Sequence, residues 1–398
     1  MTDNQSAPLH TSGKEIPFYR DERYLRAAAQ IISAALIIGA IIWVIVNFLE
    51  GAAARQLNLT FNFLKDPAGF PISDPGIPYD PSMSYGRAFM VGLVNTLRVA
   101  VLGIFFAVTI GTLVALSRLS SNWLLSRLAL AYIEFHRNIP LLVLIFLWYS
   151  TVFTEFPSVQ EAIELPGPTY LSQRGTFITW PRLTETGRPF LYATLLGILA
   201  AYFAFKTLRR KRAETGQETY YFPISMALLI ILPTAGWFIS GGEPIWWDIP
   251  EFVGRNFAGG LKLTPEFGGL FVALIMYTSG FIAEVVRAGI QAVSRGQFEA
   301  AQAIGLKPTQ VLSLVVLPQA MRVIIPPLIS QFLNLTKNTS LALGVGYQDV
   351  FSVGKIAINQ SGRAIPAFAI VMSIYLILSL LTSFVLNLYN RRIQFVTR

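Results

Sequence analysis

Apolar residues along this chain come in blocks of about 20, separated by polar stretches rich in Pro and Gly, and they do not alternate as in half-buried strands. A helix needs roughly 20 such residues to cross a hydrocarbon core of about 30 Å. The first block is too long for the core of a signal peptide, so we expect it to be retained as a span. The blocks predict an all-α membrane protein with about eight transmembrane helices: Ala27–Leu49, Gly86–Leu116, Ile139–Phe153, Phe190–Phe205, Tyr221–Ile239, Phe267–Ile290, Arg322–Leu343 and Ala364–Tyr389.

The polar stretches between these blocks are expected outside the hydrocarbon core. Glu50–Tyr85 contains clusters of Pro, Gly, Asn and Asp that cannot continue a helix and would leave unsatisfied backbone groups in lipid. Glu155–Pro189 reads as a long irregular segment, and a loop rich in Trp and Gly begins at Gly241. The charged run Lys206–Arg212 lies between two spans, so it is predicted to be a turn at one membrane face.

Composition supports a membrane protein and indicates its orientation. Charged residues make up 13% of the chain, against about 25% in an average soluble domain, and the mean hydropathy is +0.53. With a cytoplasmic N-terminus, about 19 Lys and Arg residues fall inside and about seven in the outside loops, as the positive-inside rule requires. Both termini are then cytoplasmic. The net charge of +9 is explained by this asymmetry, because the basic residues form no continuous face for nucleic acid.

The residue inventory provides little material for catalysis. The chain has no Cys, which excludes disulfides and thiolate chemistry, and its only His residues are His10 and His136. It contains no GxxxxGK[ST] phosphate-binding loop and no recognisable nucleophile triad. We therefore predict that the chain is not an enzyme, and that it has no metal site and no cofactor.

The most informative local pattern lies in the connection between the sixth and seventh spans. The run QFEAAQAI from Gln297 favours a short helix, Gly305 stands where that helix would stop, and Pro308 opens a second helical run near its first turn. This unit is too polar to span the membrane and is tethered at both ends to membrane helices. We expect it to lie along the membrane surface and to offer a compact contact for a soluble partner.

The same connection resembles the EAA loop of ABC importer permeases. Glu299, Ala300 and Ala301 are followed after three residues by Gly305, and after nine more by VVLP at Val315–Pro318, where the family usually has Ile in place of Val315. Four further runs resemble the polar amino-acid branch, the histidine- and glutamine-type permeases: GLVNTLRVAVLG from Gly92, YIEFHRNIPLLVLIF from Tyr132, GFIAEVVRAGIQAVSRGQ from Gly280 and NLTKNTSLA from Asn334.

This resemblance extends to the organisation of the chain, although Ile139 stands where the branch more often has Thr. It implies a five-helix type I importer core with one added N-terminal helix and two inserted helices, as in the larger permease of general L-amino-acid transporters. The expected parts are a cytoplasmic tail (1–26), the extra helix with a periplasmic loop (27–85), the first core part (86–155), the insertion (156–265) and the second core part (266–398), which includes the coupling loop 297–318.

The function implied by the resemblance is that of a permease subunit of an ATP-driven importer for L-amino acids in the bacterial inner membrane. The implied partners are an ABC ATPase dimer, a second homologous permease and a periplasmic amino-acid-binding protein, besides the lipid bilayer. Glu299 and Gly305 are the expected coupling contacts with the ATPase. Ala300 and Ala301 would let the loop sit close to its partner, and Pro318 would set the angle into the next span.

Polar residues within the spans are candidates for the substrate path. Lys337 with Asn334 and Asn338 would offer hydrogen bonds and a charge to a zwitterionic amino acid, and Arg98 is a second candidate. Polar residues that simply hold helices together explain each of these positions equally well.

Two other ion pairs are expected near helix ends, at a spacing of three residues. Glu134 with Arg137, and Glu284 with Arg287, are better explained as structural pairs or interfacial anchors than as substrate contacts.

Two alternative functions stay open at this level. A secondary amino-acid carrier driven by an ion gradient would also have eight spans and buried charges, and uptake by the chain alone would support it. A membrane-bound enzyme or assembly factor would act through the long outside loops, but it would need convergent catalytic residues that the sequence does not offer.

Overall fold

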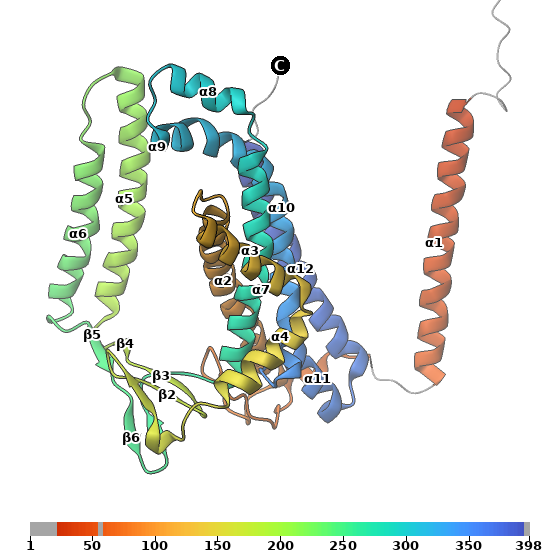
Figure 1. The fold of residues 1–398 in the computed structure, drawn as a ribbon. Coiled ribbons are helices and arrows are strands. Elements are labelled where there is room, and N and C mark those ends of the chain that lie inside the picture. Colours follow the sequence, from red (N-terminus) through yellow and green to blue (C-terminus); the bar gives the residue numbers. More distant parts are fainter. Residues whose placement is uncertain (1–21, 55–58, 394–398) are drawn as a thin grey trace, which may run out of the picture. The chain divides into compact units, whose positions relative to one another are not determined.

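The chain consists of two compact units, Met1–Phe61 and Asn62–Arg398, in a computed structural model that describes residues 22–54 and 59–393. The first unit contains α1 (Glu22–Ala54), a single apolar helix (Figure 1). Most of the expected cytoplasmic tail, residues 1–21, lies outside the described residues.

The prediction of a mostly helical protein with about eight spans is confirmed. In the described part of the chain, seven helical segments are long and apolar enough to cross a membrane, and one bent pair of helices raises the number to eight. The helices that form these segments are α1, α2 (Tyr85–Arg118), the pair α3 (Trp123–Asn138) and α4 (Leu141–Trp148), α5 (Arg188–Thr215), α6 (Tyr221–Ile239), α7 (Pro265–Gln291), α9 (Pro308–Gln310) with α10 (Leu317–Asn338), and α12 (Ala364–Ile393).

The third span differs from the expected single helix Ile139–Phe153. Helices α3 and α4 meet at 107° across the Ile139–Pro140 step, because a residue before proline is driven out of the helical region. Ile139 is accordingly extended, with φ −93° and ψ 132°. Helix α4 then continues into a π-helical turn, Tyr149–Phe153. The hydropathy pattern located the second arm of this broken helix and missed α3.

The membrane bundle is centred on α7. The most apolar stretch of this helix is 61% buried, whereas the corresponding stretches of α5 and α6 are 11% buried. Small residues recur every four positions on α2, at Gly103, Ala107, Gly111 and Ala115, and all four are buried. A Cβ added to Gly111 would lie 2.7 Å from Cγ2 of Ile282 on α7. Such small-residue stripes let helix backbones approach closely in lipid, where dispersion contacts replace the hydrophobic effect as the driving force.

The segment before α2 is irregular, as expected, but it packs tightly on the bundle. Phe63 and Phe70 are buried in one cluster with residues of α2, α11 (Val350–Ser361) and α12. Asp74 accepts a hydrogen bond from Arg98 on α2 at 2.9 Å, and their side chains are only 9% and 18% exposed. This pair anchors the segment to the bundle.

Helix α11 was not predicted. It begins at Asp349, whose carboxylate accepts a hydrogen bond from Ser352 N at 2.9 Å and another from Tyr375 Oη on α12 at 2.7 Å. Burial raises the pKa of Asp349, although these hydrogen bonds oppose the rise. The 12 residues of α11 are too few to span a bilayer, so hydropathy alone does not reveal this helix.

Helices α5 and α6 form an antiparallel hairpin, and they pack mainly on each other and little on the other helices. The expected turn at Lys206–Arg212 is wrong, because this run lies inside α5, which continues to Thr215 and ends at Gly216 with φ +70°. Lys and Arg are good helix formers, and an Arg210–Glu214 pair four residues apart supports the last turns. The turn follows at residues 216–220.

The parts of the insertion outside the spans were expected to be irregular. They instead form small antiparallel sheets (Figure 1). One sheet has the order β1-β2-β3-β8, and the other two are the pairs β4-β5 and β6-β7. The strands are too short for a clear alternation, and β3 and β4 pair with strands on the far side of the helical hairpin. The bounds are β1 (Ile163–Leu165), β2 (Thr169–Ser172), β3 (Gly175–Ile178), β4 (Trp180–Leu183), β5 (Ile245–Asp248), β6 (Glu251–Val253), β7 (Asn256–Ala258) and β8 (Leu261–Leu263).

The close approach of α2 and α7 predicts that Gly111→Ala destabilises the protein. The added methyl group would meet Ile282 and the Ser279 carbonyl oxygen at less than 3 Å, and overpacking of this kind costs roughly 1–3 kcal/mol. We expect a lower Tm for the detergent-purified variant. Gly39→Ala in α1 is the matched control, since its Cβ meets nothing within 4 Å. Equal Tm values for both variants would contradict the packing described here.

Candidate functional site

The connection between α7 and α10 folds as a short helix, a tight turn and a second helix. Helix α8 (Arg295–Ala303) ends at Gly305, whose φ is +84°. Gly305 N donates to Gln302 O at 2.9 Å, and Leu306 N donates to Ala301 O at 3.2 Å. These two bonds form a Schellman motif, which requires the left-handed conformation that glycine adopts without strain. The predicted stop at Gly305 is therefore confirmed.

Ala300 and Ala301 of this connection differ in exposure. Ala301 is 4% exposed and belongs to a core cluster that also contains residues of α2, α7 and α10. Glu299 and Ala300 are exposed, and among the described residues Glu299 has no hydrogen-bond or ion-pair partner. Ile304, which the sequence did not single out, exposes 77% of its surface beside Gly305. One face of α8 is thus fixed to the bundle, and the other is free for a partner.

Pro318 lies in the first turn of α10, directly after a π-helical turn at Val311–Val316. A proline in this position has no amide to donate to the preceding turn, and such a widened turn accommodates it. The segment from Pro308 to Gly344 therefore leaves the connection and enters the membrane as one continuous span.

A polar cavity of about 250 Å³ lies between α7 and α10. This volume is below the roughly 300–1,000 Å³ of pockets for drug-sized ligands, so it suits one small molecule. Thr278 stands midway along α7, so the cavity is near the middle of the membrane. Its lining residues are Tyr277, Thr278 and Phe281 on α7 and Gln331, Asn334 and Asn338 on α10.

The amides on α10 share one face, because Gln331, Asn334 and Asn338 are spaced by three and four residues. Among the described residues, none of the three side chains makes a hydrogen bond. Polar groups left unsatisfied at membrane depth cost several kcal/mol, so they are found where they face water, substrate or another chain. The cavity is therefore a place where a polar solute can be bound.

Arg137 adds a positive charge near this cavity. It is the penultimate residue of α3, just before the helix break, and its guanidinium carbon lies 5.2 Å from the ring centroid of Phe281. The broken helix and the cavity thus meet on α7. Broken helices that adjoin polar cavities are a recurring feature of substrate sites in transporters.

Comparisons with known proteins identify the family of this chain. Residues 103–395 match the family of binding-protein-dependent transport system inner membrane components. This chain belongs to that family. The permease is 43% identical over 370 residues to the putative amino-acid ABC transporter permease protein YhdX of Escherichia coli, covering 93% of this chain and 94% of that protein.

Two further relatives match over nearly their whole length. The permease is 41% identical to the general L-amino acid transport system permease protein AapQ of Rhizobium johnstonii, covering 99% of this chain and 98% of that protein. It is 37% identical to the glutamate/glutamine/aspartate/asparagine transport system permease protein BztB of Rhodobacter capsulatus, covering 95% and 96%. These matches give no support to the alternative of a secondary carrier.

Only part of the expected substrate-path residues come together in the permease. Asn334 and Asn338 line the cavity, whereas Lys337 is exposed and does not line it. Arg98 is engaged elsewhere, since it pairs with Asp74 and its guanidinium carbon lies 4.6 Å from the Phe267 ring centroid.

The two ion pairs expected near helix ends have different outcomes. Arg287 and Glu284 do pair, and Arg287 also donates to Gln291 Oε1 at 2.6 Å. Glu134 instead accepts a hydrogen bond from Asn138 at 2.9 Å, while Arg137 reaches Phe281. The spacing along the helix could not predict that Arg137 does not pair with Glu134, because Arg137 contacts Phe281 of α7, a helix distant in the sequence. Within residues 22–54 and 59–393, no group of three His, Asp or Glu side chains could hold a metal ion.

The left-handed turn predicts different effects for two substitutions of Gly305. Ala strains this conformation by about 1 kcal/mol, whereas Asn tolerates it better. Neither clashes within the chain, because a Cβ here meets no atom within 4 Å. We expect amide hydrogen exchange in α8 to accelerate about fivefold in Gly305→Ala and less in Gly305→Asn. Wild-type exchange in both variants would show that the turn does not hold α8.

Proposed function

We propose that this permease carries L-amino acids across the inner membrane as the larger permease subunit of an ATP-driven importer. It pairs with a second permease, binds an ABC ATPase dimer through the exposed face of α8, and receives its substrate from an extracytoplasmic binding protein. The amino-acid substrate is supported by the names of the three relatives. ATP hydrolysis takes place on the separate ATPase chain.

The observation that carries this proposal is that the surface loop connects the two walls of the polar cavity. Helices α7 and α10 line the cavity, and residues 292–316 join the end of α7 to the start of α10. Ala301, Val311 and Val316 pack in one cluster with Ile290 on α7 and Ile324 on α10. A force applied to α8 therefore moves both walls as packed bodies, which is how small displacements at an effector site reach a distant one.

The open side of the cavity supports a second permease. Asn334 is exposed in this chain although it lies at membrane depth. An exposed amide there would face lipid tails, which offer no hydrogen bonds. A second permease packed against α10 would cover it and complete the path. Arg137, which contacts the lining residue Phe281, is placed to attract the substrate carboxylate, and the amide oxygens within the cavity can accept hydrogen bonds from its ammonium group.

The orientation follows if α8 faces the ATPase. Helices α8 and α9 lie at one end of the bundle and the β-strands at the other (Figure 1). The cytoplasmic side then includes α8, the basic end of α5 and the end of α12, and the sheets are periplasmic. The distribution of Lys and Arg along the sequence favours a cytoplasmic N-terminus. We propose the same domain boundaries as the sequence predicts, with core parts at 86–155 and 266–398 around the insertion 156–265.

The proposal is tested by purifying the tagged chain from its native membrane in mild detergent and identifying what accompanies it by mass spectrometry. We expect an ATPase and a second permease. In Glu299→Lys the ATPase should be lost and the permease kept, because the charge reversal affects the free face of α8 alone. Glu214→Lys at the exposed end of α5 is the matched control. A chain that purifies alone and still transports amino acid would refute the proposal.

The cavity predicts a transport defect without an assembly defect. Asn338→Ala removes hydrogen bonds to the substrate worth about 1 kcal/mol each, so we expect the maximal uptake rate to fall about five- to tenfold. Asn387→Ala on α12 is the control, since its amide only contacts Ser383 at an exposed site. Uptake by reconstituted importer in vesicles measures both variants. Equal rates would place the substrate elsewhere.

A further inference from the structure

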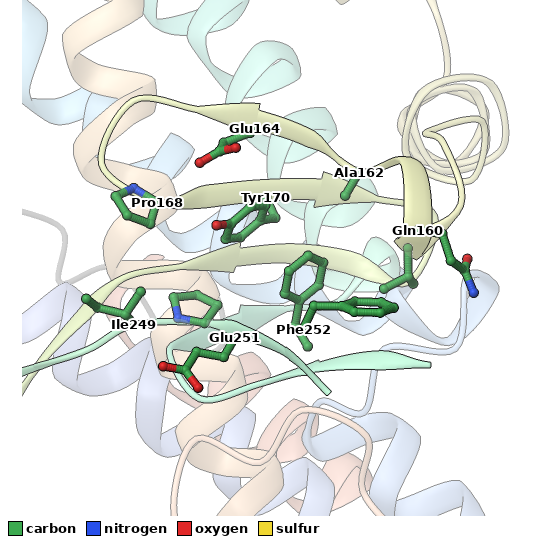
Figure 2. A pocket seen from close by; sticks show the side chains of 11 residues that line it. Gln160, Ala162, Glu164, Pro168, Tyr170, Ile249, Glu251 and Phe252 are labelled. Atoms are coloured by element: carbon green, nitrogen blue, oxygen red, sulfur yellow. The ribbon is translucent and has the colours of Figure 1, made fainter. Parts of the chain in front are cut away.

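The β-strands of the insertion line an open pocket of about 450 Å³ that shares no residue with the polar cavity between α7 and α10. Its walls come from β1, β2, β6 and β7 and from the turn that begins at Val159. Figure 2 shows the pocket from close by, with Glu164 on the β1 side, Glu251 on the β6 side and the Tyr170 ring between them in this view. We call it the Glu164/Glu251 pocket.

The floor of the Glu164/Glu251 pocket is a built aromatic cluster. Tyr170 stacks on Phe257 with their ring centroids 4.4 Å apart. Phe252 meets the same ring edge-on at 5.8 Å, and Phe177 lies 5.0 Å behind it. These four side chains belong to four different strands, so the floor is fixed by the sheets and does not depend on a loop.

The rim of the pocket carries uncompensated negative charge. Among the described residues, Glu164 and Glu251 form no ion pair and no hydrogen bond. The nearby Asp248 contrasts with them, because Arg182 already pairs with it at 2.6 Å. Carboxylates above aromatic faces attract a cation carried on an apolar stem, since the ring faces and the carboxylates both favour positive charge. Lys and Arg side chains have this chemistry.

The surroundings favour a protein over a free amino acid or a lipid surface. Beside the pocket, Ile249, Phe252 and Val253 are 47%, 50% and 60% exposed, although they lie outside the membrane spans. A small ligand would leave them in water, whereas a protein surface would cover them around a central basic anchor. An anionic bilayer surface would be repelled by the two carboxylates.

We propose that the Glu164/Glu251 pocket docks a Lys or Arg side chain of the extracytoplasmic substrate-binding protein. This inference rests on the proposed function, and it gives the insertion a role in capturing the binding protein outside the permease core. Charges on the rim of an interface act chiefly on the association rate and its salt dependence. The contact therefore speeds delivery of the binding protein without altering the transport step.

The test uses the complete importer in lipid nanodiscs and its purified binding protein. We measure ATPase stimulation against binding-protein concentration for wild type, for the double variant Glu164→Gln/Glu251→Gln, and for the control Glu185→Gln, an exposed carboxylate that does not line the pocket. In the double variant the half-saturating concentration should rise about fivefold at low ionic strength. The maximal rate should stay unchanged, and salt should remove the difference.

A charge-reversal arm identifies the partner residue. Glu164→Lys/Glu251→Lys should weaken stimulation further, and replacing one surface Lys or Arg of the binding protein by Glu should restore it. Wild-type half-saturation in both double variants would overturn the inference while leaving the importer intact. If the variants differ from wild type only in how free arginine or lysine competes in the assay, the pocket is a small-molecule site and the inference is overturned. If the binding protein does not stimulate even the wild-type importer, the proposed function itself fails.

Discussion

The close packing of α7 against its neighbours is the constraint on which the rest of the permease depends. In lipid, helices gain little from burying apolar surface, so their association depends on how closely their backbones approach. Gly111 lets α2 approach Ile282, and further along α7 a Cβ on Gly289 would lie 2.2 Å from Cγ1 of Ile324 on α10. Helices α2 and α10 therefore both pack on α7 without slack. Because packed helices move as bodies, this packing provides a mechanical connection between the α8 loop and the polar cavity.

Features with a local cause could be predicted from the sequence. The spans follow from hydropathy. The turn after α8 follows from Gly305, because the Schellman motif that ends a helix needs a residue in the left-handed conformation, which glycine adopts readily. Features that depend on distant contacts could not be predicted. The strand β3 pairs with β8 across more than 80 residues, and α11 is stabilised by Tyr375, which belongs to α12. The break at Pro140 had a local signal, since the residue before proline avoids the helical region, but hydropathy concealed it.

In the candidate site, too, features with a local cause could be predicted, whereas features that depend on distant contacts could not. The spacing of Asn334 and Asn338 places both on one face of α10, and they do line the cavity. Gln331 belongs to the same face by the same spacing and was overlooked. The roles of the arginines depend on tertiary structure: Arg98 meets Asp74 from a preceding loop, whereas Arg137 meets Phe281 of a helix that follows much later in the chain. A motif identifies which segment matters, but the three-dimensional arrangement decides which of its side chains are free: Ala300 is exposed and Ala301 is buried.

The insertion is joined directly to the core through one end of α7. Strand β8 pairs with β3 in the sheet that contributes β1 and β2 to the Glu164/Glu251 pocket. One residue after β8, Thr264 caps α7 by accepting a hydrogen bond from Phe267 N at 3.2 Å. The other end of α7 leads into α8. The α5–α6 hairpin, in contrast, packs mainly on itself. The sheet and the surface helix α8 therefore adjoin the two ends of a single helix, α7, through directly bonded chain segments.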